Sequence, residues 1–253
     1  MTKIVWTDIL CIIACIAAAG LCIYSYANGL CSDYERNTGL VCGVFCLIPI
    51  VLGRLHIIAI PDVLIVLALG AICLHSLGVL YFTYDELYFY DNITHSVSSA
   101  AVTACVFLAL TCYNVVSRRI EFRGRMVMIA VSLIMLSFSV YWEVFEYLVD
   151  SITGTGMQYN PLDTARDMIC NTVASFATAA FMQYYVNRKT PEKVISDLDL
   201  HPLLKRFIVY DFKRSFSPAV AVVQESRSDT FINKNPIAWF RGPVAQLGRA
   251  FDS

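Results

Sequence analysis

Charged side chains are scarce in this chain of 253 residues, of which 15% are Asp, Glu, Lys or Arg. Average soluble domains carry about 25% charged residues, so the composition excludes an ordinary water-soluble enzyme. The formal net charge of −1 provides no basic surface, which excludes nucleic acid as a partner. Ten cysteines are present, but nearly all fall inside apolar blocks and give no disulfide framework.

The chain has long apolar blocks instead, and 57% of its residues are hydrophobic. A helix that crosses a bilayer needs about 20 predominantly apolar residues. The blocks of this kind cover residues 4–27, 40–53, 63–81, 92–116, 126–149 and 163–185, each bound being approximate. The sequence therefore predicts an all-α integral membrane bundle of about six transmembrane helices, whose partner is the lipid bilayer.

The distribution of charge divides the chain into two regions. Of the 39 charged residues (19 + 20), 21 precede Arg188 and 18 lie from Arg188 onward. We expect a transmembrane domain over residues 1–187 and a cytoplasmic tail, partly disordered, over residues 188–253. Residues 241–253 resemble the peptide made when a reading frame runs antisense into a transfer-RNA gene, so we expect this end to be spurious.

Basic residues predict the orientation of the bundle, because short cytoplasmic loops carry an excess of Lys and Arg. The strongest basic cluster, with Arg118, Arg119, Arg123 and Arg125, lies between the fourth and fifth blocks. Placing this loop inside the cell puts both termini inside and the acidic loops outside. The sequence thus predicts a multi-pass protein of the plasma membrane with cytoplasmic N and C termini.

Polar residues, most of them ionisable, gather at one end of the last three predicted spans. They are Asp91 and His95 on the fourth span, Glu143 and Glu146 on the fifth, and Asp163, Asp167 and Asn171 on the sixth. Residues three or four apart share a helix face, and all three sets fall at the predicted outer end. Such groups are costly at membrane depth and mark functional sites. Helix capping can explain Asp91 and Asp163, but not the other residues of the set. The alternative to a functional site is a polar cluster with a purely structural role.

Carboxylates and imidazole are ligands for divalent metal ions, and crowded carboxyl groups also suit acid–base chemistry. The predicted metal ligands are Asp91, His95, Glu146, Asp163 and Asp167. The predicted catalytic residues are Glu143, Glu146 and His95. The predicted substrate-binding residues are Asn171, Gln158 and His75, the last of which has an alternative role as a histidine hydrogen-bonded between helices. We assign Tyr141, Trp142 and Tyr147 to the aromatic belt at the membrane interface.

The spaced motifs of residues 61–185 resemble a known family. They are His75-Ser76-Leu77-Gly78, Tyr81 and Tyr84, Asp91 with His95, Glu143-x-x-Glu146-Tyr147, Gly154 and Gln158, and Asp163-Thr164-x-x-Asp167-Met168-x-x-Asn171-Thr172. Together they look like the signature of the YjdF-like family of uncharacterised membrane proteins, and more distantly of VanZ-like proteins. One departure is Ala174-Ser175, where the pattern has a glycine. The resemblance implies a small polytopic bundle in the plasma membrane and implies no reaction.

Three functions fit this pattern. The first is a metal-dependent or acid–base enzyme that acts on a lipid or envelope-precursor substrate at the outer leaflet. The second is a small-solute or cation transporter, although transporter sites usually lie nearer the midplane, on helices broken by Gly or Pro. The last three spans contain neither residue internally. The third function is a non-catalytic membrane scaffold, which needs no site.

Overall fold

All regular elements in the described part of the chain are helices, which confirms the predicted all-α fold. The computed structural model describes residues 5–80, 87, 89–117, 122, 124–154 and 161–209. The helices are α1 (Trp6–Ala27), α2 (Asp33–Phe45), α3 (Ile48–Arg54), α4 (Asp62–Leu80), α6 (Tyr90–Ser117), α7 (Met126–Thr153), α8 (Pro161–Lys189), α9 (Pro191–Asp197) and α10 (Pro202–Val209).

Among the described residues, five stretches are long and apolar enough to cross a membrane: α1, α2 with α3, α4, α6 and α7. This supports a multi-pass membrane protein. Helix α8 has 29 residues, which is ample length, but its buried face carries polar residues such as Asp167, Asn171 and Gln183. That polar face lowers its average hydropathy, so a sixth crossing by α8 stays a prediction.

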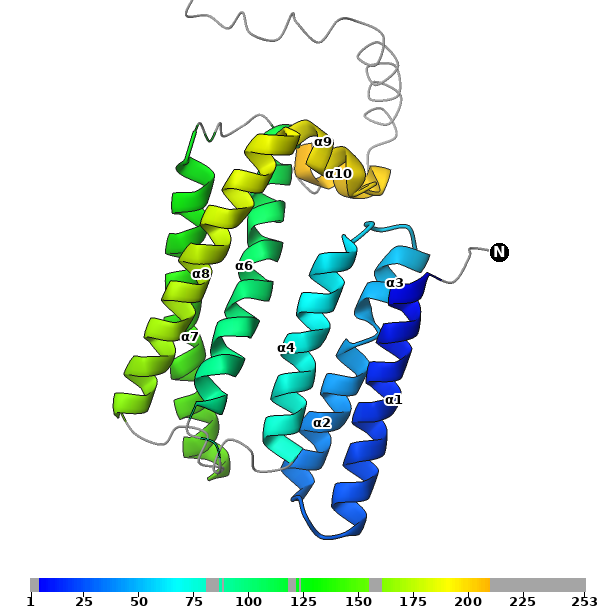
Figure 1. Cartoon of the computed structure of the whole chain (residues 1–253), viewed down its shortest axis with the longest axis vertical. Helices are drawn as coiled ribbons and strands as arrows, with labels where there is room; N and C mark the ends of the chain where they lie inside the picture. Colours follow the sequence, from blue (N-terminus) through cyan, green and yellow to red (C-terminus); the bar gives the residue numbers. More distant parts are fainter. Residues whose placement is uncertain are drawn as a thin grey trace, which may run out of the picture. The chain divides into compact units, whose positions relative to one another are not determined.

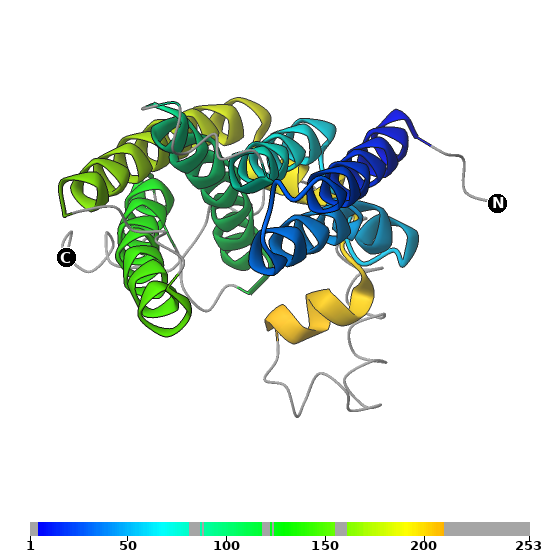
Figure 2. The same ribbon diagram turned by 90° about the horizontal axis from the view of Figure 1, so that it is seen from below.

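The long helices form two groups that meet along α4 and α6. Helices α1, α2 and α4 pack on one another, and α6, α7 and α8 form the second group. Figure 1 shows the first group in blue to cyan and the second in green to yellow, and the end-on view of Figure 2 shows the same grouping. Within the second group, α6 and α8 run in the same direction and α7 runs opposite to them (Figure 1).

The second predicted span, residues 40–53, contains a break. Helix α2 ends at Phe45 and α3 begins at Ile48, with Pro49 in its first turn. Proline has no backbone N–H to donate to the carbonyl four residues earlier, which here belongs to Phe45, and its ring clashes with that carbonyl. The helix therefore stops before the proline and restarts with it in the first turn, where proline is tolerated.

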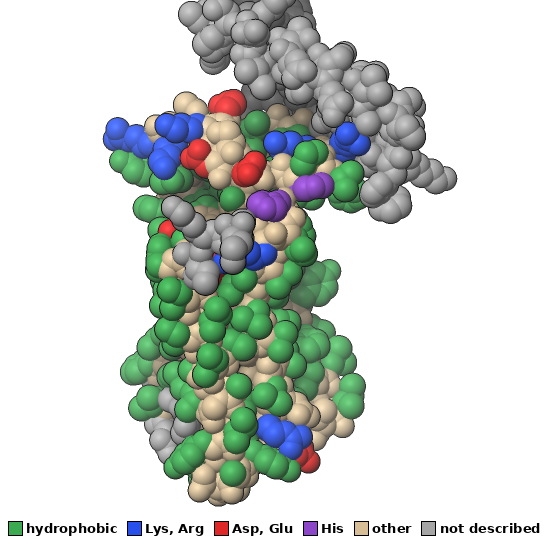
Figure 3. Space-filling view, turned by 90° about the vertical axis from the view of Figure 1, so that its right-hand side faces the viewer, with side chains coloured by type: hydrophobic (Ala, Val, Ile, Leu, Met, Phe, Trp, Pro, Cys, Tyr) green, Lys and Arg blue, Asp and Glu red, His purple; other side chains and the backbone are tan. Residues whose placement is uncertain are grey.

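Apolar side chains cover the sides of the bundle. Many large hydrophobic residues of α1 are exposed, including Ile13, Ile16 and Ile23 at 56%, 66% and 69%. Figure 3 shows hydrophobic side chains over the middle of the face on the α1 side, with charged side chains toward the two ends. An exposed apolar surface of this extent is expected where lipid, and not water, surrounds the protein.

The chain after α8 returns to the bundle. Helix α9 buries Val194 and Ile195 in the same apolar core as Phe107 of α6. Two backbone hydrogen bonds, Ala59 N to Leu198 O at 2.7 Å and His201 N to Ile57 O at 2.9 Å, join this segment to the loop before α4. The beginning of the predicted tail is thus helical. Its remainder, residues 210–253, lies outside the described residues.

Candidate functional site

Helices α6, α7 and α8 face one another with regular stripes of buried residues. The buried residues of α7 are Val127, Val131, Met135, Ser139 and Glu143, and those of α8 include Asp167, Asn171, Ser175, Ala179 and Gln183. Each stripe has a spacing of four, which keeps side chains on one helix face. Along these stripes Glu143 and Asp167 lie near His95 of α6, at one end of the three helices.

His95 lies at the centre of this end of the three helices. Its Nε2 is 3.4 Å from Asp91 Oδ1, one turn earlier on α6, and its side chain is 10% exposed. Ligand atoms of Asp91, His95 and Asp167 lie within 4.8 Å of one another, and so do those of His95, Glu143 and Glu146. The two sets share the imidazole. We refer to these five residues as the acidic cluster.

Two carboxylates of the acidic cluster are deeply buried. Glu143 is 5% exposed and Asp167 is 3% exposed. Neither oxygen of Glu143 makes a hydrogen bond of normal geometry within the described residues, although the Thr164 side chain of α8 lies near it. Oδ1 of Asp167 likewise has no such partner there. A buried carboxylate without partners is costly, so the acidic cluster requires protons or a cation to neutralise it.

Glu146 is held by a residue that sequence reasoning assigned elsewhere. The indole N–H of Trp142 donates to Glu146 Oε1 at 2.7 Å, across one turn of α7. Trp142, predicted for the aromatic belt, is 43% exposed, so it combines an apolar surface with a polar contact to the cluster. The sequence analysis missed this pair, and the i, i+4 spacing of the two residues is the signal that could have found it.

Asp163 and His75 lie beside the acidic cluster. Asp163 Oδ1 is 3.5 Å from Arg166 Nη2 on the same helix, so this carboxylate already has a cationic neighbour. His75 of α4 interacts electrostatically with both Asp91 and His95. Of the predicted substrate-binding residues, Gln158 lies outside the described residues.

Asn171 lies one turn after Asp167 on α8, in a buried hydrogen-bond network. Its Oδ1 accepts from the Ser99 hydroxyl of α6 at 2.6 Å, and its Nδ2 donates to Ser139 Oγ of α7 at 3.0 Å. The amide thus joins all three helices, and the two serines are residues that sequence reasoning missed. An amide bonded to both neighbouring helices in this position fixes the register of the helices that carry the acidic cluster.

The donor set of the acidic cluster fits a divalent cation. Carboxylate oxygens and one imidazole nitrogen suit ions such as Mn²⁺, Fe²⁺ or Zn²⁺, and the carboxylates would supply the negative charge that such an ion requires. Some of the grouped acidic and histidine side chains could therefore hold a metal ion.

Comparison with known proteins yields one family. Residues 9–188, well over half of the chain, match the model of the family described as "Predicted membrane protein (DUF2238)". The matched region spans α2 to α7, most of α1 and nearly all of α8, and so includes every member of the acidic cluster. No matching curated protein and no matching solved structure was found for the chain. The chain belongs to this family of predicted membrane proteins.

Proposed function

We propose that the chain binds a divalent metal ion through Asp91, His95 and Asp167 at the extracytoplasmic end of α6, α7 and α8. The supporting observation is that ligand atoms of these residues, which lie far apart in the sequence, come within 4.8 Å of one another. Glu146 belongs to the second set around His95 and supplies a further carboxylate on the α7 side. The contact of Asp163 with Arg166 makes Asp163 the weakest candidate ligand.

We assign proton transfer to Glu143 and its neighbours Glu146 and His95. Glu143 is buried against His95, and a carboxyl group in such a site can take up or release a proton during a reaction. A bound divalent ion would supply polarisation of a phosphoryl or carbonyl oxygen. These parts suit a metal-dependent or acid–base enzyme that acts on a lipid or envelope-precursor substrate.

The form of the helices favours catalysis over alternating-access transport. Helices α6, α7 and α8 run for 28, 28 and 29 residues, and their only Pro or Gly is Pro161, the first residue of α8. Transporters usually bind substrate at broken helices near the midplane. The YjdF-like resemblance agrees with a polytopic bundle and does not add a reaction.

Metal analysis of the purified full-length protein tests the metal site. We expect a stoichiometric divalent ion in the wild type and its loss in Glu146→Gln and Asp167→Asn. The exposed carboxylate of Glu192 on α9 provides the matched control, since Glu192→Gln should retain the metal. An equal metal content in all four proteins would contradict the proposal and leave the scaffold function.

Catalysis has its own test. Wild-type protein loaded with metal is incubated with an extract of envelope lipids, and the products are separated by mass spectrometry. We expect Glu143→Gln to retain the metal but to lose product formation, because the proton-transfer group is removed while the ligands Asp91, His95 and Asp167 remain. Product formation at the wild-type rate in Glu143→Gln would exclude the assigned role.

A further inference from the structure

We infer that α6, α7 and α8 enclose a hydrated proton path that leads from the acidic cluster toward the opposite end of these helices and is closed by Phe107. This inference goes beyond the metal site and does not require a bound metal. It rests on the order of buried residues along the three helices.

The Asn171 network fixes which residues share a level. Ser99, Ser139 and Asn171 are joined by hydrogen bonds, so they form one layer. Because the stripes have a spacing of four, and α7 runs opposite to α6 and α8, successive layers follow at about 6 Å intervals. Moving away from the acidic cluster, they are Thr103, Met135 and Ser175; then Phe107, Val131 and Ala179; then Thr111, Val127 and Gln183.

Polar groups lie on both sides of the Phe107 layer. Thr103, Thr111 and Ser175 are 0%, 3% and 2% exposed, and Gln183 is 9% exposed. Ser175 Oγ, Thr111 Oγ1 and Gln183 Oε1 have no hydrogen-bond partner within the described residues. Buried polar atoms of this kind are normally satisfied by internal water, which bonds to about three such groups.

A cavity exists beyond the Phe107 layer. Its volume is about 160 Å³, and its lining includes Phe107, Thr111, Asn114 and Gln183. This volume is ample for several water molecules, and the lining supplies the polar partners that they need. Thr111 and Gln183, the residues that carry two of the unbonded oxygens, line this cavity together with Phe107.

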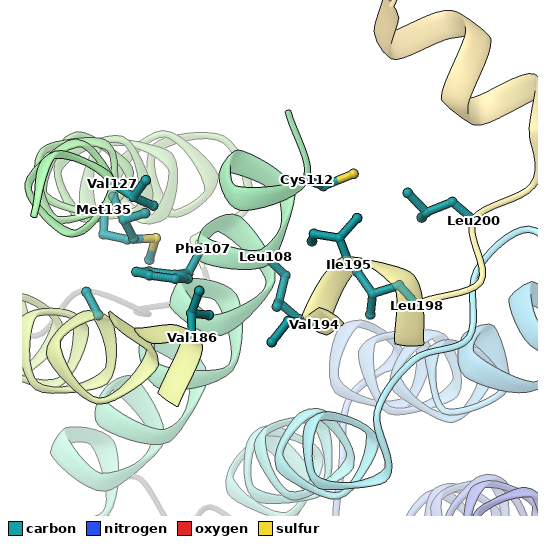
Figure 4. Packing of buried hydrophobic residues seen from close by; sticks show 12 residues of the cluster. Phe107, Leu108, Cys112, Val127, Met135, Val186, Val194, Ile195, Leu198 and Leu200 are labelled. Atoms are coloured by element: carbon teal, nitrogen blue, oxygen red, sulfur yellow. The ribbon is translucent and has the colours of Figure 1, made fainter. Parts of the chain in front are cut away.

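The Phe107 layer is dry and tightly packed. Phe107 is 1% exposed, and Val131 and Ala179 are both 0% exposed. Figure 4 shows the Phe107 ring between Val127 and Met135 of α7 and Val186 of α8. From Thr103 to Thr111 the path covers eight residues, or about 12 Å, with no polar side chain on the three stripes. A hydrophobic constriction of this kind blocks protons because water does not fill it.

Leu108, the residue that follows Phe107, provides a matched control for the Phe107 substitution. It is 8% exposed and belongs to the same apolar core, but Figure 4 shows that it points toward Val194 of α9, away from the meeting point of α6, α7 and α8. Shortening either side chain creates a cavity, but only the loss of the Phe107 ring connects the two polar regions.

Proton flux into liposomes tests the path. Full-length protein is reconstituted with a trapped pH-sensitive dye, and a potassium gradient with valinomycin drives protons inward. We expect a several-fold rise in proton flux for Phe107→Ala over wild type, no rise for Leu108→Ala, and a lower flux when Ser175→Ala is added to Phe107→Ala. Equal fluxes in the two single variants would overturn the proposal. Unchanged metal content in Phe107→Ala separates this result from the metal site, since Phe107 is no ligand.

A second measurement uses the unaltered chain, in case Phe107→Ala does not fold. Hydroxyl radicals made by X-ray radiolysis of water oxidise methionines that contact water. Met135 shares a layer with Thr103 and Ser175 and is 5% exposed, whereas Met126 at the start of α7 is 51% exposed. We expect Met135 to be oxidised at a rate comparable with Met126. Complete protection of Met135 would show that the layer is dry and would overturn the proposal.

Discussion

Asn171 of α8 accepts a hydrogen bond from Ser99 of α6 at 2.6 Å, one helical turn further into the bundle than the acidic cluster. The same amide donates to Ser139 of α7, so one side chain connects the three helices that carry the cluster. Asn171 is 5% exposed, so replacing it would leave the buried hydroxyls of Ser99 and Ser139 without this partner.

Asn171→Leu should therefore lower the free energy of unfolding by about 1–3 kcal/mol. Thermal unfolding in detergent, followed by circular dichroism, measures the effect. Thr172→Val is the control, because Thr172 is exposed on the same turn of α8. Equal melting temperatures for the two variants would show that the network does not stabilise the bundle.

Removal of the metal should destabilise the wild-type protein. A ligand that binds only the folded state adds about 2.7 kcal/mol when its free concentration is about 100 times Kd. We expect EDTA to lower the melting temperature and an added divalent ion to restore it, while Asp167→Asn responds to neither. A wild-type melting curve indifferent to both additions would contradict the proposed metal site.

Trp142 is expected to tune the acidic cluster through Glu146. Loss of a hydrogen bond to a metal ligand typically weakens metal affinity by about 10–100-fold. Trp142→Phe should show this loss in a competition titration with a chelating dye. The control is Trp6→Phe, because Trp6 Nε1 donates to Asp62 Oδ2 at 3.0 Å, at the opposite end of the helices. An affinity that falls equally in both variants would indicate a general effect of tryptophan loss.

Gly39 permits the close packing of α1, α2 and α4. A Cβ at this position would lie 2.5 Å from Cys22 Sγ and 3.1 Å from a methyl of Leu80. We expect Gly39→Ala to lower stability by about 1–3 kcal/mol, the usual cost of overpacking. Gly70→Ala on α4 meets nothing within 4 Å and should be neutral or slightly stabilising. Comparable thermal denaturation of the two variants would refute the packing argument.

Cys31 offers a test of the predicted orientation. It lies between α1 and α2, at the same end as the acidic cluster, and its thiol is free. Burial and the nearby Glu35 raise the pKa of this thiol above its ordinary value, so less thiolate is present at neutral pH. Labelling by a membrane-impermeant maleimide in intact cells should accelerate as the pH rises and should vanish in Cys31→Ser. Labelling that requires permeabilised cells would reverse the orientation.

The sequence by itself determined the helical membrane character of the protein. Long apolar blocks leave no other arrangement, because every backbone polar group in lipid must be bonded within its own helix. The spacing of four also predicted which side chains share a face, since 3.6 residues make one turn. For this reason Asp91 with His95, and Asp167 with Asn171, could be assigned to common stripes without coordinates.

Tertiary structure decided which stripes face one another and what each polar group contacts. The capture of Asn171 by Ser99 and Ser139 depends on rotation and register between helices that composition does not encode. The pair of Asp163 and Arg166, three residues apart on one helix, follows from local spacing instead. The sequence also did not predict that Phe107 packs against α7 and α8 while Leu108 points toward α9. Local periodicity fixes a helix and its faces, whereas the partner of each face is set by the packing of segments distant in the chain.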